Sequence, residues 1–415
     1  MRVGQRVRAA RARAPSSLPP AAAARNPGME IFLWSRAAIW LAALLALTLL
    51  DGSRNPRAGV WDEPAVTRDL GRLTDVWARW DSVWFLRIAE SGYGAHANDA
   101  AFFPLYPGLV GGLGRVLAGH YVLAGILVSL AAGLGAFAML YRLAERRLGA
   151  DGGRRALLYL AVFPASLFLG AVYSESLYLL LAVAAFLLAE RGRFTEAAFV
   201  AGLALLTRPS AVALLPPLVL LAWRAGGPRA AVQLAAAPAL FLAYPLLLWW
   251  RVGDPFAFLQ AQEHWNRELS PAGPLGGVWG GLEAAVAGAR QVWVGNDGHV
   301  YWPRVTEWSP LQVAAINLSL LAFLALFLWL TVVAWRRFGA PYGLFCTLSL
   351  ALPLSTPSAD WPLQSLPRFG LAVFPFFLAL AAIGGRPRLH PAIISTSALF
   401  LGVTVTQWAL WQWVA

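Results

Sequence analysis

The chain has 415 residues, of which 59% are hydrophobic and only 13% charged, and its mean hydropathy is +0.58. A soluble domain carries about 25% charged residues, whereas long apolar runs between short charged clusters indicate membrane spans. The net charge is +12, but the basic residues do not gather on an aromatic-interleaved surface, so no nucleic-acid partner is expected. The single Cys346 excludes an internal disulfide, and the five histidines are scattered, so no metal site is expected.

In chain order, we expect an arginine-rich, disordered cytoplasmic tail over 1–32 and a single transmembrane domain over 33–415. The apolar runs predict an all-α polytopic membrane protein, a bundle of about 9–11 helices, since several runs are shorter than the roughly 17 residues that cross a bilayer straight. The predicted spans lie near 33–50, 119–140, 156–171, 174–189, 194–207, 210–223, 231–250, 311–334, 341–354, 369–384 and 391–413.

The distribution of arginine predicts the orientation of these spans. If the N-terminus is cytoplasmic and the spans alternate, the inner segments hold 20 arginines against 5 acids, and the outer ones hold 13 against 16. This asymmetry follows the positive-inside rule. One span over 194–223, kinked at Pro209, would reverse every later loop, so two short spans are expected there. All 33 basic residues are arginine, a bias typical of a GC-rich bacterial genome, so the predicted location is a bacterial plasma membrane.

The first long outer loop, 51–118, contains the strongest candidate for a catalytic acid. From Leu70 to Ile88, apolar residues recur every three or four positions, which predicts one helix with a tryptophan stripe lying flat in the membrane interface. Asp81 falls at the border of this stripe. Partial desolvation there favours a general base, although an ordinary carboxylate paired with Arg79 or Arg87 fits the pattern equally well.

Further polar groups fall on the predicted outer face. Glu175 lies between two serines at the ends of two spans, where it is either functional or a turn residue at the water boundary. Arg208 and Arg368 are arginines on the face that the positive-inside rule depletes; they suit a lipid phosphate or are snorkelling side chains. The second long loop, 252–310, contains a polar-aromatic cluster that suits a sugar or an interfacial helix: Gln260, Gln262, His264, Trp265 and Asn266.

Five segments together resemble the PIG-V family of GPI-anchor mannosyltransferases and their bacterial relatives. In chain order from about residue 77 to 377, they are RWDSVWFLRIAESGY, AFFPLYP, FPASLFLGAVYSESLY, LTRPSAV and SLPRFGLAVFPFF. The first two are specific, and the arginine-containing ones are short. The family often has a glycine after the arginine of the fourth segment, whereas this chain continues Pro209-Ser210-Ala211.

The resemblance implies a GT-C membrane glycosyltransferase with interfacial helices in its first outer loop. Such an enzyme would move a mannose, or a related hexose, from a polyprenyl-phosphate sugar to an extracytoplasmic lipid, glycan or protein acceptor, with inversion at the anomeric carbon. The resemblance places the essential acid at Asp81. Our hypothesis for the reaction is that Asp81 acts as general base and that Arg208 and Arg368 hold the donor phosphate. No cofactor is expected, although a divalent metal is not excluded. Candidate substrate contacts are Trp80, Tyr106, Tyr173, Glu175, Gln262, His264 and Trp265.

Two other functions are consistent with a polytopic chain. A transporter or lipid-linked sugar flippase needs ionisable groups near the midplane of the membrane, whereas here they gather at one face. A non-catalytic scaffold for other envelope enzymes is the other alternative, and the acid-bearing loop disfavours it.

Overall fold

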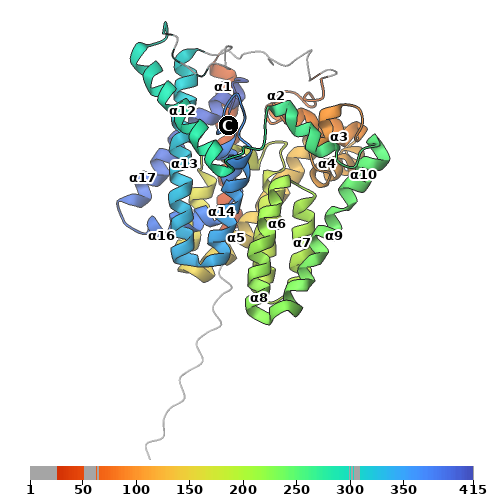
Figure 1. The fold of residues 1–415 in the computed structure, drawn as a ribbon. Coiled ribbons are helices and arrows are strands. Elements are labelled where there is room, and N and C mark those ends of the chain that lie inside the picture. Colours follow the sequence, from red (N-terminus) through yellow and green to blue (C-terminus); the bar gives the residue numbers. More distant parts are fainter. Residues whose placement is uncertain are drawn as a thin grey trace, which may run out of the picture.

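The computed structural model describes residues 26–50, 62, 65–298, 300, 302 and 309–414, and the predicted disordered tail falls mostly outside them. Within these ranges the protein is helical, as expected for an all-α polytopic membrane protein (Figure 1). Five stretches are long and apolar enough to cross a membrane: α1 (Pro27–Leu49), α5 (Tyr121–Ala161), Pro209–Val252, α13 (Pro310–Phe338) and α17 (Leu389–Ala409). Four shorter apolar helices join them: α6 (Glu175–Ala189), α7 (Phe194–Leu205), α14 (Ala340–Ser355) and α16 (Phe374–Ile383).

Two of the long stretches reverse direction at glycines. Helix α5 is interrupted at Gly149, which has a φ of 73°. Glycine adopts such a positive φ without strain. The stretch after Pro209 comprises η3 (Pro209–Leu214), α8 (Leu215–Ala231), η4 (Val232–Ala235), α9 (Ala236–Phe241) and α10 (Ala243–Val252). It is broken at Gly226 and Gly227. Both reversals fall where the sequence predicted arginine-bearing turns.

Helix α6 shows that the bundle has two chemically different ends. Its fifteen residues span about 22 Å, beginning at Glu175. Just beyond its far end, Glu190 forms an ion pair with Arg147 and accepts a hydrogen bond from the Tyr342 hydroxyl. The turns that carry the arginine clusters therefore lie at the end remote from Glu175, which is the separation that the charge pattern predicted.

The expectation of one tryptophan-striped interfacial helix in the first loop is wrong. The structure has a four-residue helix, α2 (Arg72–Asp75), and then α3 (Ser82–Ser91), with Trp80 between them at a φ of 53°. Trp77 and Trp84 are each 1% exposed, and the Trp77 ring stacks on that of Trp40 in α1. The C-terminal part of the stripe, with Ile88, packs into the protein, whereas Leu70 and Leu73 are exposed. The prediction failed because a periodic apolar face does not distinguish a bilayer from the protein interior.

Two span boundaries also differ from the prediction. Residues 27–32, assigned to the tail, are the first turns of α1. The predicted span 156–171 is helical only to Ala161, and irregular chain with the short 3-10 helix η2 (Ser166–Leu169) follows. Backbone groups freed inside a membrane need partners within the protein. The buried Arg36 supplies them, since its guanidinium donates to the carbonyl oxygens of Ala161 and Ser166.

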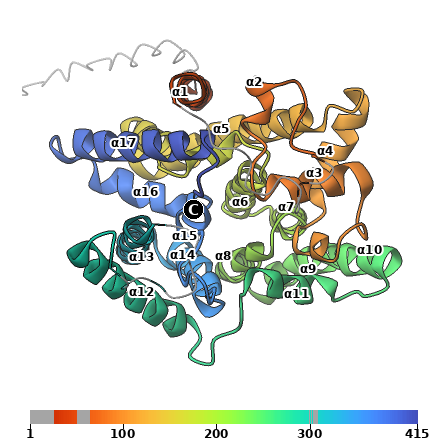
Figure 2. The same ribbon diagram turned by 90° about the horizontal axis from the view of Figure 1, so that it is seen from above.

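The two long loops that the sequence predicts on the outer face form helices over the described residues. The first contains α2, α3, η1 (Ala97–Ala101) and α4 (Leu105–Val116), and the second contains α11 (Ala257–Gln260), η5 (Ala261–Trp265) and α12 (Pro274–Val294). A further short helix, α15 (Leu366–Leu371), precedes α16. Seen from above, α3, α7, α11 and α15 surround the centre of this end of the bundle, and the C-terminus lies beside them (Figure 2).

The close packing of α3 on α4 gives a prediction for stability. A Cβ at Gly111 of α4 would lie 2.5 Å from the carbonyl oxygen of Ala89 in α3, whereas one at Gly112 would meet nothing within 4 Å. Gly111→Ala should lower the free energy of unfolding by about 1–3 kcal/mol because it forces backbone apart, and Gly112→Ala should not. Thermal unfolding of both variants in detergent checks this, and equal midpoints would contradict it.

Candidate active site

A cavity of about 630 Å³ lies at the end of the bundle where α6 begins. Its walls come from the first outer loop, the α5–α6 connection, the α7–η3 connection, η5, the residues around α15 and the C-terminal segment. The elements that meet there are far apart in the sequence. The volume is in the range of pockets that hold small-molecule ligands.

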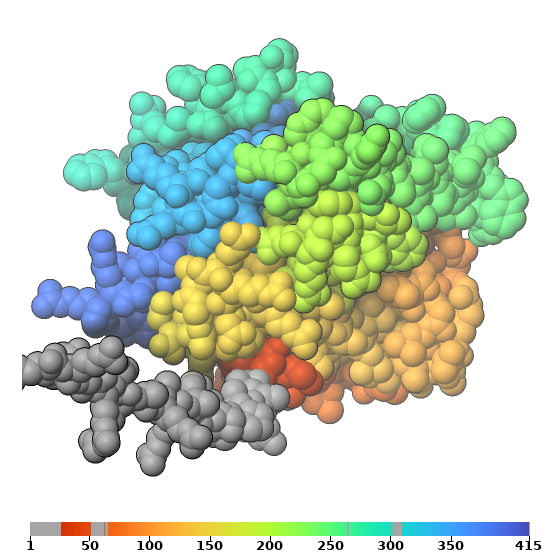
Figure 3. Space-filling view, turned by 90° about the horizontal axis from the view of Figure 1, so that it is seen from below, coloured from red at the N-terminus to blue at the C-terminus, as the bar shows by residue number. Residues whose placement is uncertain are grey.

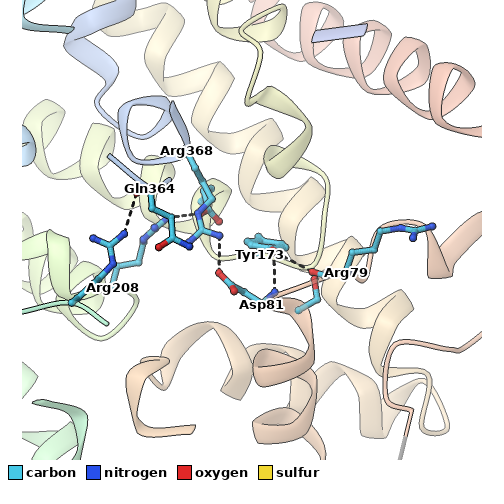
Figure 4. A network of polar contacts seen from close by, with 9 residues as sticks. Arg79, Asp81, Tyr173, Arg208, Gln364 and Arg368 are labelled. Carbon is cyan, nitrogen blue, oxygen red and sulfur yellow. Dashed lines mark hydrogen bonds and ion pairs between the residues drawn. The ribbon is translucent and has the colours of Figure 1, made fainter. Parts of the chain in front are cut away.

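Asp81 sits at the rim of this cavity with its side chain turned away from its own helix. It occupies the N-cap position of α3, where an aspartate ordinarily accepts a hydrogen bond from the first turn, yet it makes no capping bond. Its Oδ2 accepts instead from Arg368 Nη1 at 2.7 Å (Figure 4). The Tyr173 hydroxyl holds the loop from behind, accepting from the Asp81 amide and donating to the Arg79 carbonyl, each at 3.1 Å.

Glu175 is the second acid of the site, and it is 1% exposed. Its Oε1 lies 2.7 Å from Arg208 Nη1 and 3.4 Å from Arg368 Nε. As the first residue of α6, it is also stabilised by the positive end of the helix dipole. Arg208 reaches it because Pro209 ends the helical path after α7 and leaves Arg208 extended.

Arg267 is a third arginine of the cavity, and the sequence did not single it out. Its guanidinium donates to the carbonyl oxygens of Thr356 at 3.1 Å and Gln364 at 3.0 Å. In the described part of the chain no carboxylate forms a salt bridge with it. Burial, with a smaller effect from Arg368, lowers the pKa of Arg267 to about 10, against an opposing effect of Asp81.

The three guanidiniums gather around one aromatic ring. The Cζ atoms of Arg208, Arg267 and Arg368 lie 5.8, 5.5 and 5.7 Å from the centroid of Phe369, distances typical of cation–π contacts. Burial acts to lower the pKa of Arg368, but Asp81 and Glu175 outweigh it and raise that pKa above its ordinary value. Three cations thus face two acids, which leaves one positive charge in excess.

The sequence-predicted residues fall into three groups. Those that line the cavity are Trp80, Asp81, Tyr173, Glu175, Arg208, Gln262, Trp265 and Arg368. Tyr106 does not line it; it is fully buried, and its hydroxyl bonds with Gly125 and Ser129 of α5. Packing of the proline-rich turn against α5 explains why Tyr106 lies outside the lining of this cavity. The side chain of His264 lies outside the described residues.

Backbone strain collects around the same cavity. Among the described residues, five other than glycine have a positive φ, and three of them are Trp80, Asn266 and Ser365. Trp80 and Ser365 line the cavity, and Asn266 stands between two lining residues. Such conformations cost about 1–3 kcal/mol each and cluster at functional sites. Trp80 directly precedes Asp81, Asn266 directly precedes Arg267, and Ser365 begins the helix that carries Arg368.

Over the ranges that the structure describes, no group of three or more His, Cys, Asp or Glu side chains could hold a metal ion. The expectation that no metal takes part stays a prediction.

The fold and this site define an all-α polytopic membrane protein with a buried cluster of acids and arginines at one end. Residues 64–216, a little over a third of the chain, match the family model described as Mannosyltransferase (PIG-V). The match includes Asp81, Glu175 and Arg208, while Arg267 and Arg368 lie beyond it. It supports assignment of the chain to a PIG-V-like mannosyltransferase family and a glycosyltransferase role. No curated protein was found to match the chain.

Because Glu175 is more deeply buried than Asp81, replacing each acid with its neutral amide should lower the free energy of unfolding by different amounts. Glu175→Gln leaves Arg208 buried without a counter-ion, so it should lower the free energy of unfolding by about 3–5 kcal/mol. Asp81→Asn should cost at most about 2 kcal/mol, because Arg368 keeps Glu175 as a partner. Thermal or denaturant unfolding in detergent checks this order, with the exposed Glu90→Gln of α3 as control. If Asp81→Asn proved less stable than Glu175→Gln, Glu175 would not be the acid that compensates the buried arginines.

Proposed function

We propose that the protein is an inverting glycosyltransferase that moves mannose, or a related hexose, from a polyprenyl-phosphate sugar to an extracytoplasmic acceptor. The observation that carries the proposal is that the carboxylate of Asp81 and a net-cationic group of three arginines share one cavity. A base for the acceptor and cations for a phosphate leaving group are the two elements that such a transfer needs.

The proposed reaction is a single displacement. A hydroxyl oxygen of the acceptor attacks the anomeric carbon of the sugar from the face opposite the phosphate, and its proton passes to Asp81. The bond between the anomeric carbon and the phosphate oxygen breaks, and its electron pair remains on the polyprenyl phosphate. The arginines stabilise that developing charge, and attack from the opposite face inverts the anomeric carbon.

Arg368 requires an exchange of partners in this scheme. It is bonded to Asp81 Oδ2 and also faces Glu175. A donor phosphate beside Arg208, Arg267 and Arg368 would draw Arg368 from Asp81, which frees that oxygen to accept the proton. Donor binding and activation of the base would then be one event.

The aromatic and amide side chains of the cavity wall are the proposed sugar contacts. Trp80, Trp265 and Gln262 line the cavity; a flat ring suits the apolar face of a hexose, and an amide suits its hydroxyls. Tyr173 has a different proposed role, because its hydroxyl already holds the Asp81 loop. It positions the base.

The proposed membrane orientation follows from the arginine asymmetry. Arg147, which pairs with Glu190 beyond the far end of α6, lies at the end of the bundle remote from the cavity, and Arg386 lies beside Arg154 after the same turn of α5. By the positive-inside rule, that end would be cytoplasmic. The cavity would then face the extracytoplasmic side of a bacterial plasma membrane. The acceptor, a lipid, a glycan or a protein, would be reached there.

The role of the base can be tested with labelled polyprenyl-phosphate mannose. Transfer of label to material from membranes of a deletion strain should fall about 10²–10⁴-fold in Asp81→Asn. Glu90→Gln on the same helix should retain wild-type transfer. Wild-type turnover by purified Asp81→Asn would refute the general-base role. Label that crosses vesicles but stays on the polyprenyl phosphate would instead indicate a flippase.

The excess positive charge predicts a donor effect at Arg267. Arg267→Gln should raise the KM for the polyprenyl-phosphate donor about 10–100-fold, since a hydrogen bond to a charged group contributes about 1.5–3 kcal/mol. Arg267→Lys keeps the charge and should recover part of that loss. The exposed Arg251→Gln of α10 is the matched control. A lower melting temperature of Arg267→Gln with an unchanged donor KM would show that Arg267 only ties loops together.

A further inference from the structure

A second cavity lies at the opposite, arginine-rich end of the bundle. It has a volume of about 360 Å³ and lies between α5 and the turn that joins α16 to α17. Its lining includes Asp151, Arg154 and Arg155 from α5, Arg386 from the turn and His390 from the first turn of α17. Figure 3 shows this face, with the α5 segment in yellow beside the C-terminal helices in blue. None of these residues takes part in the proposed transfer.

Specific contacts hold the walls of this cavity in place. Arg155 Nε donates to the carbonyl oxygen of Ala381 at 3.2 Å, which ties α5 to α16. The hydroxyl of Tyr159, a residue that is 1% exposed, lies 2.9 Å from His390 Nδ1. The backbone at Gly384 comes so close to that hydroxyl that a Cβ would lie 2.1 Å from it. These contacts hold α5 against α16 and the first turn of α17 on one side of the cavity, while Arg154 and Arg386 are exposed at its edge.

The charge of the cavity favours an anion. Three arginines face the single carboxylate of Asp151, which gives an excess of two positive charges with His390 neutral. Over the described ranges, no salt bridge engages Arg154, Arg155 or Arg386. Their guanidinium groups suit the oxygens of a phosphate, which they can bind in pairs of hydrogen bonds.

The place of the cavity along α17 favours an anion that is part of a lipid. The 21 residues of α17 extend about 31 Å, close to the roughly 30 Å of a hydrocarbon core, so its first turn lies at a membrane boundary. Further along, α17 exposes large apolar side chains, with Leu399 at 68%, Phe400 at 50% and Val403 at 48%. Acyl chains can cover that surface, whereas a free phosphate cannot.

We propose that this second cavity binds the headgroup of an anionic phospholipid. The phosphodiester lies among Arg154, Arg155 and Arg386, and the acyl chains run along the exposed face of α17. Basic pockets between membrane helices are suited to such headgroups. The bound lipid would link α5 to the α16–α17 turn. This proposal is independent of the glycosyl transfer proposed for the first cavity.

The test compares lipids on the purified full-length protein. In mixed micelles, phosphatidylglycerol should raise the melting temperature and remain bound in native mass spectra, and phosphatidylcholine at the same fraction should do neither. The double variant Arg154→Ala/Arg386→Ala should weaken retention of phosphatidylglycerol at least about tenfold, because it removes more than one hydrogen bond to a charged group. The double variant Arg336→Ala/Arg337→Ala removes two exposed arginines from the same end, outside the cavity, and should retain wild-type binding.

The remaining outcomes overturn the proposal. Equal retention by the two double variants would show that the cavity is not the site. An equal thermal shift from inorganic phosphate, with no added effect of phosphatidylglycerol, would indicate a soluble anion. If Arg154→Ala/Arg386→Ala fails to fold, competition between phosphatidylglycerol and phosphatidylcholine on the wild-type protein still decides, since equal retention of both lipids contradicts a headgroup site.

Discussion

The end of the bundle that holds the larger cavity depends on Arg368, whose guanidinium joins two acids from distant parts of the chain. It bonds to Asp81, 287 positions away, and faces Glu175 at the start of α6. Removing such a cation from water costs several kcal/mol, and only good geometry with opposite charges offsets this cost. Because Glu175 also holds Arg208, one ionic cluster fixes the first outer loop, the α5–α6 connection, the α7–η3 connection and α15 relative to one another.

The same cluster explains why strained backbone is tolerated around the cavity. Trp80 and Ser365 adopt left-handed conformations, and each stands close before a charged residue of the cluster. Ion pairs and the buried Trp77 and Trp84 hold these turns, so stability elsewhere maintains a geometry that the local sequence disfavours. An aspartate that leaves its own helix uncapped in order to face a cavity is a further instance of local stability given up for function.

Much of the topology could be predicted from the sequence, because it follows from hydropathy and charge alone. Pro209 separates two short spans, and Gly149 lies in an arginine-bearing turn, as the charge alternation required. The meeting of Asp81 with Arg368, and of Glu175 with Arg208, was expected only from their common face. What failed was the assignment of apolar faces. Trp77 and Trp84 show the right period, but the sequence does not say whether a bilayer or another helix covers them.

The roles of individual residues in the site were less predictable, because they depend on contacts that only the fold creates. Tyr106 belongs to a segment that resembles the family, yet its side chain points into α5. Arg267 was overlooked because it resembles any arginine of an outer loop; the structure distinguishes it by burial and by carbonyl partners that leave its charge uncompensated. A sequence pattern identifies the face on which a residue lies, but partners so distant in sequence appear only in the fold.

The arrangement of charges also bears on how an anion would bind. Asp81 and Glu175 already neutralise Arg208 and Arg368, so a phosphate that engages these two arginines would exchange partners with the acids, whereas its contact with Arg267 would be a new one. The affinity for the phosphate would then depend on the difference in free energy between the arginine–phosphate pairs that form and the arginine–carboxylate pairs that break. In the proposed reaction, Arg208 and Arg368 would stay paired with the two acids before the donor arrives, and a carboxylate would be released only when a phosphate takes its place. In a low-dielectric cavity, where an uncompensated charge is costly, the proposed exchange would join recognition of the donor to activation of the base without any change of fold.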